Sequence, residues 1–499
     1  MESIYKILCN EIYGRYGVAN RDIKQGELIL KERPLIISPP LGAKPICFKC
    51  CTVVSKKYLQ VCEKCKTAFI CGPNCSGVFH TNQECDQLTK LEVDFSLLKN
   101  YEEIIPILRI LLVRYYSAGL WKELNELESH VEARRNTPIW KTHQILVEDI
   151  LKDTKLISEK DIENETIQKI CGILDVNTFE IRAPPSMSIL NSKCQNLRGL
   201  YLNAALMAHN CISNTHLAVD DDFMLYIYAS VDIQKDTPIF LNYANAMQGT
   251  LERKNHLREG KYFECFCTRC LDPSELGTHI SSLKCHKCLK GKLQFENLTW
   301  TCTFCGKSFN RLLIENTLRQ VRYLMEDTDP TSIMELEKLH GRLLQTLHPQ
   351  HYMMLELQQN LIGLYSQSVP SRENLTRKID LCQNLLKVIQ VLEPGISRVQ
   401  GLTLNELHSS IANLAYLEYS KREISLEILL QRLKLSEDIL KAALKHLLYE
   451  PKKSPEGSLA QNALRHLKIL RESINDVEIE LKQQNSKSKR KMKNKNTDY

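Results

Sequence analysis

The chain has 499 residues, of which 43% are hydrophobic and 25% are charged, so its length predicts about two to four soluble globular domains. Its net charge of +7 is uneven, because residues 486–499 carry six basic side chains against Asp498 and leave a nearly neutral body. That balance argues against a large nucleic-acid-binding face. We expect neither a signal peptide nor a membrane span, because the first residues lack basic and apolar regions and no long apolar stretch occurs.

The first part of the chain, residues 13–38, has the pattern of short strands punctuated by Gly14 and Gly17. Its turn sequence Asp22–Glu27 is echoed much later by Asp232–Thr237, and an apolar strand follows each. Two distant segments with matching turns are predicted to belong to one sheet system that the residues between them interrupt.

Residues 46–86 contain the first of three cysteine blocks. Twenty cysteines without a signal peptide indicate a reducing compartment and metal-bound thiolates rather than disulfides. Two or three residues separate the paired thiols, and a tight turn of that length aims both sulfurs at one zinc ion. The candidate ligands are Cys47, Cys50, Cys62, Cys65, Cys71, Cys75, His80 and Cys85.

Residues 87–171 have apolar residues at three- and four-residue steps, which predicts a helical insert. Residues 172–246 turn strand-like again, and His216–Ala229, with its turn at Asp220–Asp222, predicts a β-hairpin. The same segment contains the motif Ala-His-Asn-Cys-Ile-Ser-Asn, which ends at Asn214.

Two further cysteine blocks follow. Residues 247–278 contain three clustered thiols that lack a fourth zinc ligand, and Cys211 is the natural candidate for it. Residues 279–308 contain two pairs that predict a structural zinc ribbon, with a glycine after each pair to supply a positive φ. The ligands of these two sites are Cys211, Cys265, Cys267 and Cys270, then Cys285, Cys288, Cys302 and Cys305. We therefore expect about four zinc ions per chain.

Residues 309–483 show helical periodicity that is broken at prolines, which predicts an all-α, tetratricopeptide-like array without a clear repeat. We expect its inner face to pack over the preceding domain and narrow a substrate cleft; a groove for another protein's helix is the alternative. The basic residues 484–499 are expected to be a disordered tail, either a solvated end or a segment for nuclear import or an acidic partner.

The eight ligands of residues 46–86 resemble a MYND finger, which implies that Cys47, Cys50, Cys71 and Cys75 hold one ion and that Cys62, Cys65, His80 and Cys85 hold the other. The His209–Cys211 motif, the Asn242–Tyr243 pair and the three later cysteines resemble a SET domain with its post-SET zinc site. A MYND finger that interrupts a SET domain and precedes helices is the pattern of the SET and MYND domain protein-lysine methyltransferases. Residues 347–352 and 393–398 look like the arthropod-specific branch of that family.

The resemblance covers essentially the whole chain and implies an α+β multidomain fold, with residues 1–45 as the first part of the split SET domain. It also implies methyl transfer from S-adenosylmethionine to a lysine of a histone or another protein. Tyr243 would be the catalytic residue and would also contact the cofactor. The other implied cofactor contacts are His209, Asn177 at the methionine end, and Phe263 against the adenine.

Several positions depart from the family pattern. The first asparagine of the histidine motif, a cofactor ligand, is Ala208, and losing such a hydrogen bond costs roughly 1.5–3 kcal/mol. The first glycine motif is stretched to Gly14–Gly17. A second tyrosine, usually two residues before Phe263, is Lys261, with Tyr262 shifted by one position and so turned to the other face of a strand. The alternative function is a catalytically weak or inactive adaptor that binds partners through its MYND finger and helical array.

The resemblance also implies partners and a location. The MYND finger is expected to bind a proline-rich peptide, and the protein is expected to act in transcriptional regulation, in both cytoplasm and nucleus, as a monomer.

Overall fold

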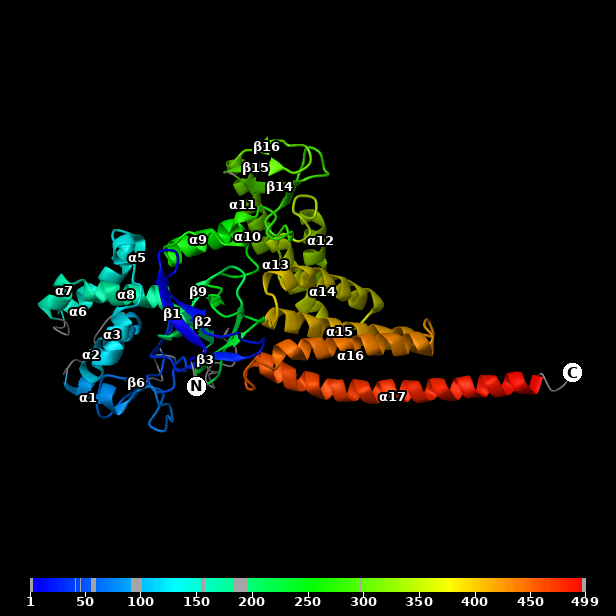
Figure 1. The fold of residues 1–499 in the computed structure, drawn as a ribbon, viewed down its shortest axis with the longest axis horizontal. Helices are drawn as coiled ribbons and strands as arrows, with labels where there is room; N and C mark the ends of the chain where they lie inside the picture. Colours follow the sequence, from blue (N-terminus) through cyan, green and yellow to red (C-terminus); the bar gives the residue numbers. More distant parts are fainter. Residues whose placement is uncertain are drawn as a thin grey trace.

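The computed structural model describes residues 3–40, 42–44, 46–54, 60–90, 101–153, 158–182, 196–296 and 298–495. Figure 1 shows a β-rich centre that both the first strands and the green middle segment build. The helical insert (cyan) lies on one side of this centre, and the C-terminal helices lie on the other. A small β-ribbon projects between them at the top of the view.

Four small sheets make up the β-rich centre. The N-terminal strands complete sheets of the later segment, because β3 pairs with β11 and β4 pairs with β8. The predicted hairpin is confirmed as the antiparallel pair β10 and β11. The strands are β1 (Tyr5–Asn10), β2 (Gly14–Ala19), β3 (Leu28–Glu32), β4 (Ile36–Ser38), β7 (Thr178–Arg182), β8 (Asn196–Leu200), β9 (Ala208–His209), β10 (Thr215–Val219), β11 (Leu225–Ala229) and β12 (Phe240–Leu241).

The two echoed turns contact each other reciprocally. Ile23 and Ile233 exchange two backbone hydrogen bonds of 2.8 Å. The Asp232 side chain accepts from the backbone of Gln25 at 2.8 Å, and Asp22 accepts from that of Lys235 at the same distance. The prediction that both segments belong to one sheet system is therefore confirmed, and the sequence echo reflects a local two-fold arrangement.

The segment between the two halves contains a cysteine-rich module and a helical insert. Its first elements are β5 (Gln60–Val61), β6 (Phe69–Ile70), α1 (Asn82–Lys90) and α2 (Tyr101–Tyr116). The helices that follow are α3 (Ala118–Asn125), α4 (Val131–Arg134), α5 (Pro138–His143), the π-helix η3 (Gln144–Glu148), α6 (Asp149–Asp153), α7 (Glu159–Glu163) and α8 (Thr166–Asn177). Because α8 continues to Asn177, the strands resume at Thr178 rather than at residue 172.

The segment after the hairpin begins with two helices and a four-stranded ribbon. These elements are α9 (Thr250–Gly260), α10 (Thr268–Leu271), β13 (Leu283–Lys284), β14 (Lys292–Glu296), β15 (Thr299–Cys302) and β16 (Ser308–Phe309), and the short 3₁₀ helix η4 (Ala204–Leu206) precedes β9. The helical array then comprises α11 (Arg311–Asp327), α12 (Ile333–Leu343), α13 (Tyr352–Gln367), α14 (Arg372–Leu392), α15 (Arg398–Ser420), α16 (Leu426–Leu447) and α17 (Pro455–Lys495).

Local sequence explains where the array helices start and stop. In α12, α14, α15 and α16 a serine precedes the first turn, and its hydroxyl accepts a backbone N–H that has no helical partner. The 41-residue α17 extends past the body of the molecule in Figure 1. Here the structure differs from the expected tail of residues 484–499: no glycine or proline follows Gly457, so the helix continues to Lys495. Residues 496–499 lie outside the described part.

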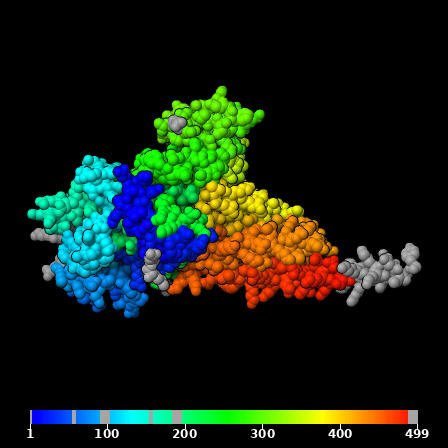
Figure 2. Space-filling view, viewed as in Figure 1, coloured from blue at the N-terminus to red at the C-terminus, as the bar shows by residue number. Residues whose placement is uncertain are grey.

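The helical array is docked on the sheet of β3, β10 and β11. Gly395 lies so close to Ser230 that an added Cβ would stand 1.8 Å from its carbonyl oxygen, and Ile396 donates to that oxygen at 2.9 Å. Figure 2 shows the array (orange) against the N-terminal strands (blue). The expected packing of the array over the β-rich centre is therefore present. None of the helices in the described part is long and apolar enough to cross a membrane.

Candidate metal centres and active site

The structure gathers all sixteen candidate metal ligands into four groups. Within each group the ligand atoms lie within 4.8 Å of one another. The groups are Cys47, Cys50, Cys71 and Cys75; Cys62, Cys65, His80 and Cys85; Cys211, Cys265, Cys267 and Cys270; and Cys285, Cys288, Cys302 and Cys305. Each group is one of those that the sequence predicts, including the interleaved pairing of the first block.

The spacing inside the groups fits tetrahedral zinc. A Zn–S bond of about 2.3 Å places two thiolates of a tetrahedron about 3.8 Å apart. The measured Sγ–Sγ distances are 3.8 Å for Cys47–Cys75 and for Cys50–Cys71, 3.9 Å for Cys62–Cys85, 3.9 Å for Cys211–Cys265, 3.9 Å for Cys285–Cys305 and 3.7 Å for Cys288–Cys302. The four groups therefore could each hold one zinc ion without rearrangement.

His80 is oriented for metal binding by a residue that the sequence did not single out. Its Nδ1 lies 2.7 Å from the Glu84 carboxylate, and its Nε2 lies 3.6 Å from Cys65 Sγ. Arg109 of α2 donates to the same carboxylate at 2.5 Å. A carboxylate behind a histidine ligand fixes the ring and its tautomer. The His-x3-Glu spacing across the start of α1 was the available signal.

The ribbon site corrects one detail of the sequence prediction. Gly306 has a φ of +67°, as expected for a glycine that follows a cysteine pair. Gly291 does not have a positive φ; Leu289 does instead, at +58°. Gly291 is needed for space, because an added Cβ would stand 2.3 Å from Cys302 Sγ.

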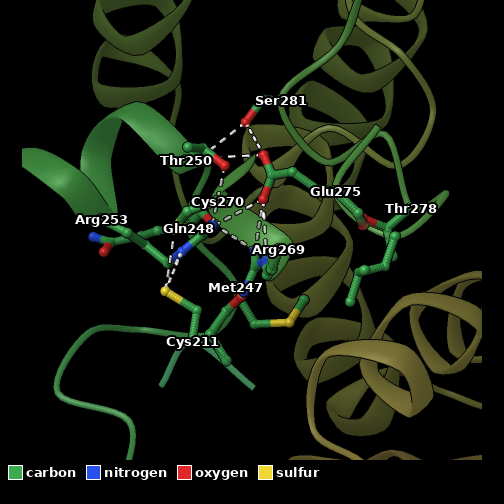
Figure 3. Close-up of polar contacts among 12 residues, drawn as sticks. Cys211, Met247, Gln248, Thr250, Arg253, Arg269, Cys270, Glu275, Thr278 and Ser281 are labelled. Atoms are coloured by element: carbon green, nitrogen blue, oxygen red, sulfur yellow. Dashed lines mark hydrogen bonds and ion pairs between the residues drawn. The ribbon is translucent and has the colours of Figure 1, made fainter. Parts of the chain in front are cut away.

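Behind the Cys211 group lies a buried network of charged residues, drawn in Figure 3. Arg253 of α9 donates to Cys211 Sγ at 3.3 Å and to Cys270 Sγ at 3.4 Å. It also donates to the Glu275 carboxylate at 2.8 Å, and Arg269 donates to the same oxygen at 3.0 Å. Burial alone would raise the pKa of Glu275, but the two guanidinium groups hold it below its ordinary value.

This network connects the metal group to the segments around it. Arg253 and Arg269 are fully buried, and both donate to the carbonyl oxygen of Gln248, at 2.6 and 2.9 Å. Glu275 accepts from the backbone of Thr250 at 3.1 Å and also from the Ser281 hydroxyl. Polar residues in a helix and a loop gave no sequence signal for such an arrangement.

Next to the Cys211 group, three of the predicted cofactor-contacting residues come together. The His209 ring lies 5.2 Å from the Tyr243 ring and 5.7 Å from the Phe263 ring, measured between centroids. Strand β9, which ends at His209, runs parallel to β12, and Tyr243 follows β12. The backbone N–H of Tyr243 donates to His209 Nδ1 at 3.0 Å. The site is thus assembled from segments that are distant in sequence.

The electrostatics of this site keep His209 and Tyr243 neutral. Burial lowers the pKa of His209 to about 4, and Nδ1 accepts a hydrogen bond, so the proton of the neutral ring belongs on Nε2, 3.4 Å from Cys211 Sγ. Burial also raises the pKa of Tyr243 well above its ordinary value. The Tyr243 hydroxyl donates to the carbonyl oxygen of Met207.

Asn177 is placed differently from the other three. It ends α8, and its side-chain amide donates to the carbonyl oxygens of Glu128 at 2.7 Å and Ile173 at 2.9 Å. Of the residues that depart from the family pattern, Ala208 is buried in β9, while Gly17 contacts Met207 so closely that an added Cβ would stand 2.5 Å from its sulfur. A side chain at position 17 would therefore require the Met207 side chain to move.

Comparisons with known proteins agree with this architecture. The family model described as "SET domain" matches residues 14–244. The Drosophila melanogaster protein "SET domain-containing protein SmydA-8, isoform A" is 27% identical over 315 residues, covering 61% of this chain and 65% of the relative. The fission yeast "SET domain and MYND-type zinc finger protein 6" is 23% identical, covering 60% and 59%. The chain therefore contains a SET domain and is similar to SET and MYND domain proteins.

Other relatives are named for an activity. The human "Histone-lysine N-methyltransferase SMYD3" is 22% identical over 265 residues, covering 50% of this chain and 57% of the relative. The aligned region of this chain spans between 53% and 68% of the first three relatives' lengths. A solved SET domain, of "LSMT bound to Lysine and AdoHcy", matches with 13% identity over 95% of this chain and 89% of that one, at a TM-score of 0.22.

Proposed function

We propose that this chain is a SET and MYND domain protein and an S-adenosylmethionine-dependent protein-lysine N-methyltransferase. The observation that supports it is the convergence of His209, Tyr243 and Phe263 beside the Cys211 metal group. The cofactor, when bound, supplies a methyl group that is already activated on a sulfonium. The chain therefore has to align the acceptor amine and exclude water rather than generate a strong nucleophile.

The residues present fit parts of that task. Tyr243 keeps its proton, and the Met207 carbonyl fixes the direction of its hydroxyl, so its oxygen can accept a hydrogen bond from an acceptor amine. His209 holds the Tyr243 backbone through Nδ1. The acceptor must arrive without its extra proton, since an ammonium is not a nucleophile, and a partly desolvated site favours the neutral amine.

Substrate, partners and location are part of the same proposal. Relatives named histone-lysine methyltransferases support a lysine of a histone or another protein as the acceptor. The MYND finger would bind a proline-rich peptide of a partner protein, and the protein would act in transcriptional regulation in the cytoplasm and nucleus. We propose that it works as a monomer, without contacting nucleic acid or membranes directly.

A second function, an adaptor with little or no activity, is favoured by specific positions. Ala208 offers no amide to a cofactor, and the amide of Asn177 is already bonded to two backbone carbonyls. The docked helical array and the MYND finger would then provide the binding surfaces. The two functions differ in whether the chain binds the cofactor at all.

Calorimetric titration of the zinc-loaded chain with S-adenosylhomocysteine, the product that lacks the sulfonium charge, tests the proposal. We expect saturable binding that His209→Asn weakens about tenfold or more, with the asparagine oxygen replacing Nδ1 as acceptor for Tyr243 and limiting damage to the fold. Tyr243→Phe should leave that affinity within about twofold but lower methyl transfer to recombinant core histones about tenfold or more. Absence of binding in the wild-type chain, with four zinc ions present, would favour the adaptor.

A further inference from the structure

Lys261 directs its amine into the candidate active site. It is the residue after α9, and its Nζ donates a hydrogen bond to the carbonyl oxygen of Val176 at 2.5 Å. The same nitrogen lies 5.8 Å from the centroid of the Tyr243 ring. The amine is thus lodged between the last turn of α8 and the tyrosine proposed to align the methyl acceptor.

This amine has no carboxylate partner in the described part of the chain. The carboxylate of Asp175 affects the pKa of Lys261 electrostatically. That carboxylate is already paired with Arg134 at 2.8 Å, His143 at 2.9 Å and Arg198 at 3.4 Å. Burial lowers the pKa of Lys261 to about 8. A partly buried lysine without an ion pair is costly to keep, so its position calls for an explanation in terms of the site.

The backbone at the next residue, Tyr262, turns the aromatic ring away from the site. Tyr262 has a φ of +61°, and its ring packs against His130 of the helical insert at 5.4 Å between centroids. The aromatic side chain therefore leaves the site while the lysine enters it. Phe263 returns toward His209, so the segment alternates its side chains around the site.

We propose that Lys261 is a selectivity residue whose ammonium weakens binding of a positively charged group beside Tyr243. The inference rests on the proposed function, because it concerns the sulfonium of S-adenosylmethionine and the ammonium of a substrate lysine. Two like charges held in the same partly buried site repel strongly enough to change an affinity about tenfold or more. S-adenosylhomocysteine has lost that charge, so Lys261 opposes the methyl donor more than the product.

Calorimetry that compares the two ligands isolates this charge effect from shape. Wild type, Lys261→Met and Lys261→Gln are titrated with S-adenosylmethionine and with S-adenosylhomocysteine. We expect both variants to bind S-adenosylmethionine about tenfold or more tightly than wild type, while their affinity for the product stays within about twofold. The Gln variant keeps a hydrogen-bond donor for the Val176 carbonyl, whereas the Met variant has none. Comparing the two therefore separates the effect of the lysine charge from the effect of this hydrogen bond.

Lys290→Met is the matched control. Its Nζ lies 5.7 Å from the Phe304 ring, a similar cation–π contact, but it is exposed on the ribbon. We expect it to change neither affinity. Zinc content of four per chain establishes that each variant is folded at its metal groups.

The outcomes separate the inference from the function it rests on. If wild type and the Lys261 variants bind both ligands with the same affinity ratio, the inference is overturned and the methyltransferase proposal stands. Cofactor binding that appears only in the variants supports the inference and explains a weak wild-type enzyme. If none of the four proteins binds either ligand, the methyltransferase proposal fails and the inference fails with it.

Discussion

Replacing Arg253 by methionine is expected to weaken zinc binding by the Cys211 group and to lower the stability of the fold around it. The guanidinium makes five hydrogen bonds, to Cys211, Cys270, Glu275, Thr250 and the carbonyl of a residue in the preceding loop. Methionine keeps most of the volume and removes the charge. Four thiolates around Zn²⁺ carry a net charge of −2, so the loss of a buried cation beside them is unfavourable.

The magnitude follows from which acceptors are left unpaired. Arg269 still donates to Glu275 and to the Gln248 carbonyl in the variant, so the two thiolates lose the most. Breaking a buried ion pair costs about 3–5 kcal/mol. Because Arg269 remains paired with Glu275, we expect Arg253→Met to lower the free energy of unfolding by about 3 kcal/mol. Loss of a group that hydrogen-bonds metal ligands costs about 10–100-fold in metal affinity.

The assay is zinc content by plasma emission after dialysis against a series of chelator concentrations, together with thermal unfolding. We expect Arg253→Met to release one of four ions at about 10–100-fold lower chelator activity than wild type. Arg258→Met is the control, because this exposed residue of α9 pairs with Glu264 at 3.4 Å and surface pairs contribute little. Equal zinc retention and equal unfolding temperatures in the two variants would refute the reasoning.

Two further predictions concern the folded core. Below pH 8 Lys261→Met should be more stable than wild type by up to about 3 kcal/mol, because the pKa of Lys261 falls from 10.5 unfolded to about 8 folded and the native state holds its proton less tightly. That advantage should shrink as pH rises from 8 to 10.5, measured by chemical unfolding at each pH, and a pH-independent difference would contradict it. Gly17→Ala should destabilise by about 1–3 kcal/mol because its Cβ meets Met207, whereas Gly119→Ala, in open space on α3, should not; equal unfolding midpoints would contradict this.

Local spacing in the sequence predicted the metal groups and the hairpin because both are short-range features. Two cysteines separated by two residues can be aimed at one ion by a single turn, whatever the rest of the fold does. The pairing of Cys211 with thiols more than fifty residues later was also predicted, because that trio lacked a ligand. The structure confirms this pairing, because Cys211 Sγ lies 3.9 Å from Cys265 Sγ and 3.5 Å from Cys270 Sγ. The fold therefore brings the residues after β9 close to those at α10.

Other parts of the site could not be read from the sequence. Arg253 and Glu275 resemble the charged residues of any solvated helix or loop, and only packing shows that both are buried. The shift of Tyr262 by one position was predicted to turn its ring away, and the ring does face the helical insert, although through a positive φ in a loop and not on a strand. The same loop directs the Lys261 side chain toward the site, and no sequence pattern predicted that direction.

Metal binding and assembly of the active site are expected to be coupled in this architecture. His209 is two residues from Cys211, and Phe263 is two residues before Cys265, so an ion held by those cysteines would keep both aromatic side chains near Tyr243. Without the ion, the buried guanidinium groups of Arg253 and Arg269 would face neutral thiols and share only the single carboxylate of Glu275. Zinc removal should therefore separate the cofactor-facing residues as well as the ligands, because the charge of the metal group also stabilises the network behind it.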